Sequence, residues 1–166
     1  IGYRLADAEG PGRFDDSFYD LLASEARLAS FVAIAKGDVP QHHWFHLGRL
    51  VTSVDGRATL MSWGGTMFEY LMPQLLMRSF EGTLLDQSCR ASVRRQIDYG
   101  RQRDVPWGIS ESAYAFTDRE GNYQYRAFGV PGLGLKRGLA TDLVVAPYAT
   151  ALASLVSPAA AADNFE

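Results

Sequence analysis

The sequence predicts a mainly α-helical domain with one or two small β-hairpins. Three observations lead to this fold class: apolar residues recur at helical spacing in several stretches, shorter stretches alternate around Gly-containing turns, and Gly- and aromatic-rich loops join them. The 166 residues are 47% hydrophobic and 21% charged, which suits a globular domain with a sizeable core. Because the chain starts at Ile1 and stops soon after a new helix begins at Ser157-Pro158, we expect residues 1–166 to be part of a single domain of a longer protein.

The charge and the cysteine content narrow the classes of function. The net charge is −3 and no Lys/Arg cluster follows a helix face, which disfavours nucleic acid as a partner. Cys89 is the only cysteine, so the chain forms no internal disulfide. The longest apolar run, residues 143–156, is interrupted by polar residues and is too short to span a bilayer. We therefore expect no direct membrane contact from this segment.

The clearest predicted helix spans residues 16–36. Asp16 or Ser17 can cap its first turn, and Gly37 can end it in a left-handed conformation. Glu25 falls inside the apolar stripe of this helix. A carboxylate facing a core is costly unless it is paired, protonated or used in chemistry, which makes Glu25 a candidate functional residue.

A second face of the same helix carries Asp20, Ser24 and Arg27. This face predicts either a solvated polar surface with a weak ion pair or polar groups that support a site from behind.

A histidine cluster follows in residues 39–46, which predict one helical turn. His42, His43 and His46 have helical ligand spacing, but no further ligand of the usual zinc pattern lies nearby. Trp44 instead indicates that this turn anchors on the core. We therefore expect neither a metal site nor a cofactor.

The next helix is predicted over residues 67–77, after a flexible loop at Trp63. Thr66 can cap this helix, and Pro73 should bend it because proline cannot donate to the carbonyl of Glu69. Glu69 lies among large apolar residues, so it is either a binding-site acid or a structural carboxylate with satisfied hydrogen bonds.

The remaining regular elements are predicted from turn signals and apolar periodicity. They are a turn-rich or hairpin segment in residues 50–60 with its turn at Asp55-Gly56, and a hairpin in residues 116–128 with its turn at Glu120-Gly121-Asn122. Helices are predicted over residues 84–101 and 148–155.

Residues 106–114 combine an acid with aromatic and hydroxyl side chains. Ser110 can cap a short helix, in which case Glu111 is a capping acid in the first turn. Alternatively, Glu111 is a loop-borne carboxylate in a site with an aromatic wall made by Trp107 and Tyr114.

Aromatic residues make up 12% of the chain. Packing in the core and at interfaces accounts for most such residues. Sugar-binding clefts also combine aromatic faces, which stack on pyranose rings, with acids that bind hydroxyl groups. Trp63, Trp107, Tyr114 and Tyr125 are the candidates for such stacking.

Two carboxylates across a glycosidic bond can cleave it. The acid needs a raised pKa, which an apolar setting supplies, and Glu25 matches that role. The nucleophile must stay ionised, which hydroxyl groups and backbone N–H groups favour. Glu111 lies between Ser110 and Ser112 and matches the second role.

Four motifs resemble the glucoamylase-like central domain of bacterial cyclic β-1,2-glucan synthases. The motifs are residues 21–37 (LLASEARLASFVAIAKG), 67–73 (MFEYLMP), 106–114 (PWGISESAY) and 128–138 (FGVPGLGLKRG), and the resemblance runs over about residues 3–162.

The resemblance implies a partial α/α toroid of the six-hairpin type. It implies that Glu25 is the acid/base and Glu111 the nucleophile of a retaining transglycosylase that cyclises linear β-1,2-glucan. The implied substrate-binding residues are Asp20, Arg27, Trp63, Glu69, Trp107, Ser110, Tyr114 and Tyr125.

The implied partners are the glucan and the glycosyltransferase and phosphorylase-like regions of the same polypeptide, on the cytoplasmic side of the bacterial inner membrane. An inverting endo-β-1,2-glucanase and a non-catalytic glucan-binding scaffold remain as alternative functions.

Overall fold

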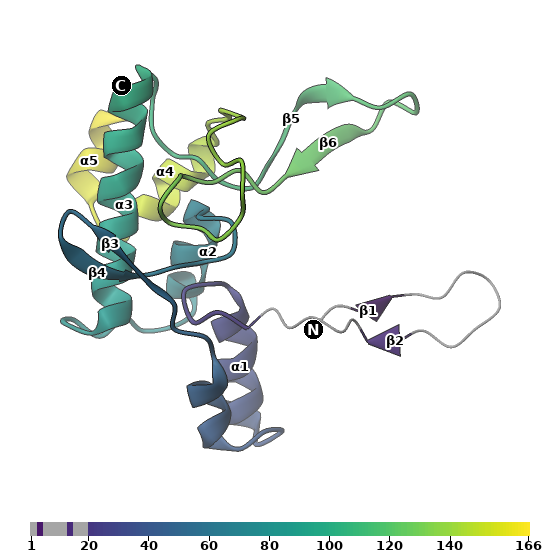
Figure 1. The fold of residues 1–166 in the computed structure, drawn as a ribbon, viewed down its shortest axis with the longest axis vertical. Coiled ribbons are helices and arrows are strands. Elements are labelled where there is room, and N and C mark those ends of the chain that lie inside the picture. Colours follow the sequence, from purple (N-terminus) through teal and green to yellow (C-terminus); the bar gives the residue numbers. More distant parts are fainter. Residues whose placement is uncertain (1–2, 5–12, 15–19) are drawn as a thin grey trace.

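The computed structural model describes residues 3–4, 13–14 and 20–166. Its helices and two-stranded antiparallel sheets are shown in Figure 1. The helices are α1 (Ala26–Lys36), η1 (Gln41–His46), α2 (Met67–Leu71), η2 (Met72–Leu75), α3 (Leu84–Arg103), α4 (Pro147–Ala153) and α5 (Pro158–Asp163), where η denotes a 3-10 helix. The strands are β1 (Tyr3–Arg4), β2 (Arg13–Phe14), β3 (Val51–Val54), β4 (Arg57–Leu60), β5 (Ser112–Thr117) and β6 (Tyr123–Arg126).

The predicted mainly α-helical fold, a partial α/α toroid, is wrong. In the described part of the chain α3 has 20 residues and α1 has 11, and every other helix is shorter, so no hairpin of two long antiparallel helices forms. Strand pairs β1–β2, β3–β4 and β5–β6 alternate with the helices, and no regular element covers residues 127–146. The chain is a mixed α and β structure because turns and Pro73 interrupt the stretches that read as long helices.

The first predicted helix is shorter than expected. The predicted caps Asp16 and Ser17 lie outside the described residues. The segment just before α1 forms a turn, because the N–H of Leu22 donates to the carbonyl of Gly48 (2.9 Å) and the N–H of Gly48 donates to the carbonyl of Asp20 (2.7 Å). These bonds to a distant segment replace the bonds of a continuing helix. The C-terminal end was predicted correctly: Gly37 adopts φ +80° and closes α1.

The buried side of α1 is polar. Arg27 and Ser30 are its buried residues, whereas Phe31 and Val32 are each 46% exposed. Of the predicted apolar stripe, Leu21 and Leu22 just before α1 are buried, whereas Leu28 is half-buried and Ala29 and Val32 on α1 are exposed.

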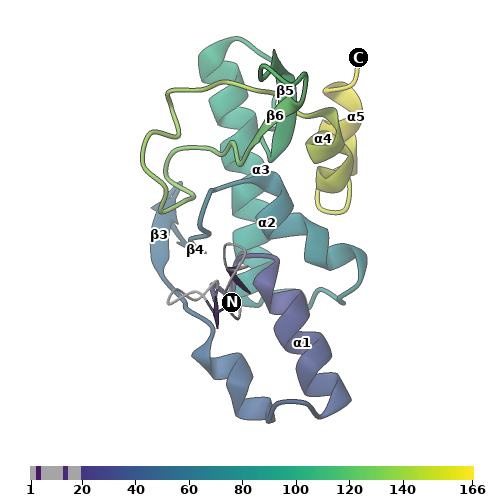
Figure 2. The ribbon, with the colours of Figure 1, turned by 90° about the vertical axis from the view of Figure 1, so that its right-hand side faces the viewer.

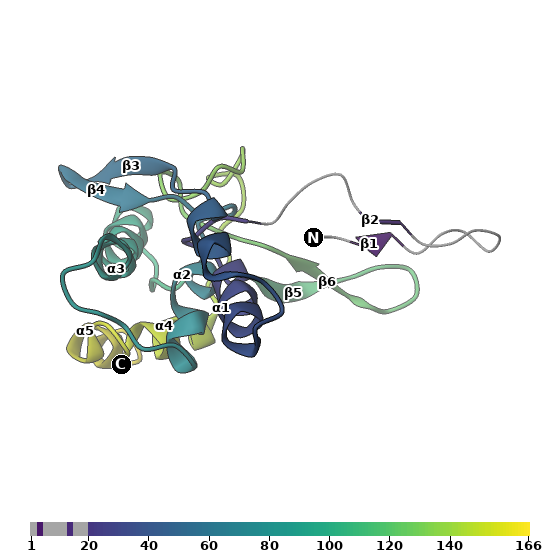
Figure 3. The same cartoon turned by 90° about the horizontal axis from the view of Figure 1, so that it is seen from below.

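Helix α3 is the centre of the core. The β3–β4 hairpin lies on one side of α3, and α2 packs against α3 from another direction (Figures 2 and 3). Cys89 and Val93 of α3 are fully buried. Helix α4 packs on α2, and α5 packs on α4.

Two glycine-containing loops meet beside α2. Ser62 and Gly134 form a backbone bridge, and the N–H of Lys136 donates to the carbonyl of Trp63 (2.9 Å). A Cβ atom on Gly134 would lie 2.5 Å from backbone atoms of Gly64 and Gly65, so only glycine allows this approach. The Gly-rich segment of residues 129–138 is therefore a packing element that shapes the neighbouring loop.

Both predicted hairpins are confirmed. The β3–β4 turn consists of Asp55 (φ +50°) and Gly56 (φ +73°), both in the left-handed region that such turns require. The β5–β6 hairpin extends away from the body of the molecule (Figure 1) and begins at Ser112, just after Glu111. The backbone next to Glu111 is thus a strand start, so of the two alternatives for residues 106–114 the short helix capped by Ser110 is excluded and the loop-borne Glu111 remains.

Candidate functional site

A cavity of about 390 Å³ lies between three segments that are distant in the sequence. These are the loop before α2, the residue before β5 and the chain after β6. The residues that line it are Trp63, Gly64, Glu69, Glu111, Ala127, Leu135 and Lys136. Three of the sequence-predicted site residues (Trp63, Glu69 and Glu111) therefore share one cavity.

The backbone and the side chain of Glu111 are both held by tyrosine hydroxyl groups. The Tyr125 hydroxyl donates a hydrogen bond to Oε2 of Glu111. The Tyr148 hydroxyl lies 2.7 Å from the Glu111 carbonyl oxygen and 2.8 Å from Oγ of Ser110. Ser110 is fully buried and its Oγ also accepts from the N–H of Phe68 (3.0 Å) at the start of α2. Ser110 thus fixes the main chain that carries Glu111.

Glu25 is the N-cap residue of α1 and is half-buried. Burial raises the pKa of Tyr125, and its hydrogen bond to Glu111 together with the charges of Glu111, Tyr148 and Glu25 raises it further. The charge of Glu25 is the smallest of these contributions, whereas Glu111 acts on Tyr125 through a direct hydrogen bond.

Glu69 is almost completely buried, and its carboxylate organises the loop before α2. Its oxygens accept from Oγ of Ser62 (2.9 Å) and from the N–H groups of Trp63 (2.9 Å), Gly64 (3.0 Å) and Thr66 (3.0 Å). Thr66 in turn accepts from the N–H of Glu69, which completes a capping box at the start of α2. Glu69 therefore positions the main chain of Trp63, which is a wall of the cavity.

Arg27 lies apart from this cavity, buried beneath the end of α2. Pro73 has no N–H to donate to the carbonyl of Glu69, and the Arg27 guanidinium donates to that carbonyl instead (3.1 Å). Arg27 also donates to the carbonyls of Tyr70 and Ser24, and burial lowers its pKa. A guanidinium nevertheless stays charged in proteins, so Arg27 is a buried cation at a helix C-terminus, where the dipole favours it.

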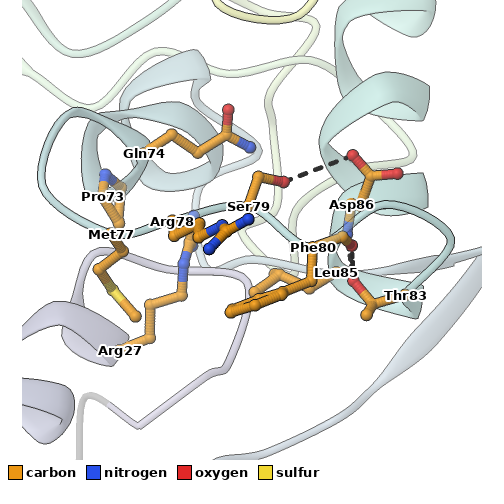
Figure 4. A pocket seen from close by; sticks show the side chains of 10 residues that line it. All are labelled: Arg27, Pro73, Gln74, Met77, Arg78, Ser79, Phe80, Thr83, Leu85 and Asp86. Carbon is orange, nitrogen blue, oxygen red and sulfur yellow. Dashed lines mark hydrogen bonds between the residues drawn. The ribbon is translucent and has the colours of Figure 1, made fainter.

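A second, much smaller cavity of about 50 Å³ adjoins Arg27 (Figure 4). Its other lining residues come from η2, from the connection to α3 and from the start of α3. Buried Asp86 lines it and accepts from the N–H of Gly82 and from Nε of Arg90. A space of this size holds water but no sugar ring.

The remaining predicted residues take several positions. Trp107 is 93% buried, and its backbone is bound by Asn164 and Thr150. Tyr114 is half-buried on β5 and packs edge-on against Phe128. Asp20 is half-buried in the turn before α1. The structure thus places Trp107 in the core and Tyr114 on the face of the hairpin opposite Tyr125.

Local sequence patterns did not identify two residues near the site. Lys136 donates from Nζ to the carbonyl of Ala127 (2.9 Å), which joins the Gly-rich segment to the end of β6 across the cavity. Tyr148 reaches the Glu111 backbone from α4, as described above. The Gly-rich motif at residues 128–138 was the only sequence signal near Lys136, and no local signal indicated Tyr148.

Two further properties concern the described residues as a whole. Within residues 20–166 no group of three or more His, Cys, Asp or Glu side chains could hold a metal ion. His43 instead shares a 3.3 Å hydrogen bond with Ser30 of α1. None of the helices in this part of the chain combines the length and apolar character that a membrane span requires.

Comparison with known proteins identifies the family. The model of the Glycoamylase family, described as "Putative glucoamylase", matches residues 17–166. The chain is 51% identical over 164 residues to the cyclic beta-(1,2)-glucan synthase NdvB of Rhizobium meliloti (strain 1021), an alignment that covers 99% of this chain. The chain spans about 6% of the length of that relative. The resemblance inferred from the four motifs is confirmed, and the chain belongs to the Glycoamylase family of glucoamylase-like domains.

Proposed function

We propose that this chain carries the catalytic acid pair of a retaining transglycosylase that cyclises linear β-1,2-glucan. The observation that carries the proposal is Glu111, which lines a cavity together with Trp63 and whose Oε2 accepts a hydrogen bond from the Tyr125 hydroxyl. The name of the NdvB relative supports β-1,2-glucan as the substrate class. It also supports further domains of the same polypeptide as partners, since the chain matches a small part of that relative.

Glu111 is the nucleophile in this proposal. The Tyr125 hydroxyl donates a hydrogen bond to Oε2 of Glu111 and so fixes the orientation of the carboxylate. The carboxylate attacks the anomeric carbon of the glucan while the glycosidic C–O bond breaks. The product is a glycosyl ester on Glu111, and the configuration of the anomeric carbon is inverted once.

Glu25 is the general acid and then the general base. In the first step its proton passes to the leaving glycosidic oxygen. In the second step a 2-hydroxyl group of the same glucan chain attacks the glycosyl ester, its proton returns to Glu25, and Glu111 leaves as the carboxylate. The second inversion restores the original configuration and closes the ring. Trp63 forms an apolar wall beside Glu111 that disfavours water as the acceptor.

The test is a product analysis with the full-length protein and linear β-1,2-glucan. A cyclic product is lighter by one water than the linear chain with the same number of glucose units, so mass spectrometry distinguishes the two. We expect cyclic products from the wild type. Only shortened linear products that have gained water would indicate an endo-β-1,2-glucanase and would refute the cyclisation.

Two variants test the roles of the acids. Glu111→Gln should abolish turnover, and Glu25→Gln should lower it by about 10²–10⁴-fold, the usual contribution of a general acid. Glu120→Gln, at the exposed tip of the β5–β6 hairpin, is the matched control and should retain full turnover. Undiminished turnover in Glu111→Gln would exclude Glu111 as the nucleophile and would favour a different residue pair or a binding scaffold.

A further inference from the structure

The two faces of the β5–β6 hairpin differ in the contacts that their aromatic side chains make. Ala113 pairs with Tyr125 and Tyr114 pairs with Gln124, so the members of each pair project to the same face. Residues two apart on a strand also share a face, which places Tyr123 beside Tyr125. The face of Tyr125 is the one that reaches Glu111.

The opposite face is occupied by contacts within the chain. The ring of Tyr114 packs edge-on against Phe128 with centroids 5.5 Å apart, and stacks on Phe116 at 6.5 Å and an interplanar angle of 15°. The guanidinium of Arg126 lies over the same Tyr114 ring at 5.9 Å. Arg126 is in turn paired with Asp142 (3.1 Å). The aromatic and charged side chains on this face therefore contact one another within the chain.

The Glu111 face lacks such partners at its outer end. Tyr123 is 71% exposed, and among the described residues its side chain has neither a hydrogen bond nor a ring contact. Tyr125, one step nearer the cavity, is 61% exposed but donates its hydroxyl to Glu111. An aromatic strip therefore leads outward from the carboxylate along one strand.

We propose that Tyr123 is the stacking platform of an outer subsite that holds the β-linked glucan chain beyond the sugar at Glu111. The proposal rests on the proposed function and names a residue that binds substrate without taking part in the bond change. Side chains two residues apart on a strand are about 6.6 Å apart, roughly the length of one hexose unit. A chain that stacks on Tyr125 can therefore reach the Tyr123 ring with its next units.

The chemistry of the ring suits this occupant. A pyranose presents a face of C–H groups, and an aromatic ring buries that face without requiring a charge. The hairpin extends from the body of the molecule (Figure 1), so an extended polymer can lie along it. The continuity of the strip with the Glu111 cavity is what selects a glucan over other occupants.

Binding to the full-length protein tests the inference. Calorimetry in a Glu111→Gln background, which removes turnover, measures the dissociation constants of a long linear β-1,2-glucan and of its disaccharide. We expect Tyr123→Ala to weaken binding of the long glucan about tenfold, equivalent to about 1.4 kcal/mol, and to leave the disaccharide unaffected. Tyr123→Phe keeps the ring and should bind like the parent.

Phe116→Ala is the matched control, because Phe116 is 62% exposed on the same hairpin and stacks on Tyr114 of the other face. It should leave both dissociation constants within about twofold of the parent, a change of less than about 0.5 kcal/mol. In the protein with Glu111 intact, Tyr123→Ala should raise KM for long glucan and leave kcat unchanged.

Three results would overturn the inference: unchanged binding in Tyr123→Ala, equal weakening by Phe116→Ala, or equal weakening by Tyr123→Phe. Failure of the proposed transglycosylase function gives results that differ from these three. Wild-type protein that binds glucan through Tyr123 but makes no products supports the subsite and refutes the transglycosylase. Absence of any glucan binding refutes both.

Discussion

Replacing Glu69 by glutamine should destabilise the loop that forms one wall of the candidate site. The Glu69 carboxylate accepts hydrogen bonds from four donors, of which three are backbone N–H groups. In Glu69→Gln one oxygen becomes an NH₂ group, which is itself a donor. If the remaining oxygen faces Ser62 and Thr66, the NH₂ group faces the N–H of Trp63, which loses its acceptor.

The magnitude follows from these bonds. One buried donor left without an acceptor costs about 1–3 kcal/mol, and the remaining bonds weaken because the charge is gone. We therefore expect Glu69→Gln to lower the free energy of unfolding by about 2–4 kcal/mol. Glu69→Ala removes both acceptor oxygens and should cost more.

Urea denaturation followed by tryptophan fluorescence measures this change. The control is Glu81→Gln, since Glu81 is exposed and its loss should change the free energy by less than about 0.5 kcal/mol. A Glu69→Gln variant as stable as this control would contradict the expected loss, because the four donors would then not depend on the carboxylate.

Two further substitutions test the buried polar groups. Arg27→Lys should lower the free energy of unfolding by about 2–4 kcal/mol in urea denaturation, because an ammonium cannot reach every carbonyl that the buried guanidinium satisfies. The control is Arg101→Lys on the exposed side of α3, which should have little effect on this free energy. A similar loss in both variants would contradict this role of Arg27. Tyr70→Phe should cost about 1–3 kcal/mol at neutral pH, because the buried Tyr70 hydroxyl lies 2.7 Å from the carbonyl oxygen of Leu60 and 2.9 Å from that of Leu133. Burial raises the pKa of Tyr70, so its contribution is present below about pH 10 and is lost as the pH rises toward the folded-state pKa. Thermal denaturation as a function of pH should show a smaller alkaline loss of stability in Tyr70→Phe, and an identical alkaline slope in both proteins would disprove the assignment.

Local chemistry made several elements predictable from the sequence. Asp55-Gly56 specifies the β3–β4 turn because both residues tolerate positive φ. Thr66 marks the start of α2 because a threonine side chain can accept from a backbone N–H of the first helical turn. These signals depend on neighbours in the chain, and the structure confirms them.

Predictions that depended on long-range partners were less successful. The helix expected over residues 16–36 begins only at Ala26, because the backbone before it bonds to Gly48. The helix cap at Ser110 was one of two alternatives, and its buried hydroxyl instead binds the start of α2 and Tyr148. In each case a partner far away in the sequence supplied bonds that local periodicity cannot anticipate.

Motifs and neighbouring residues were sufficient to predict the family and the two hairpin turns, and they also selected the two acids proposed for catalysis. The burial of Arg27 depends on the folded chain, because its guanidinium binds carbonyls 42 and 43 residues away, where Pro73 ends the regular hydrogen bonding of α2. The folded chain also brings the Tyr125 hydroxyl to the carboxylate of Glu111, 14 residues away. The physical reason is that a buried charge or carboxylate is stable only where distant segments supply its partners, and those segments meet only in the folded chain.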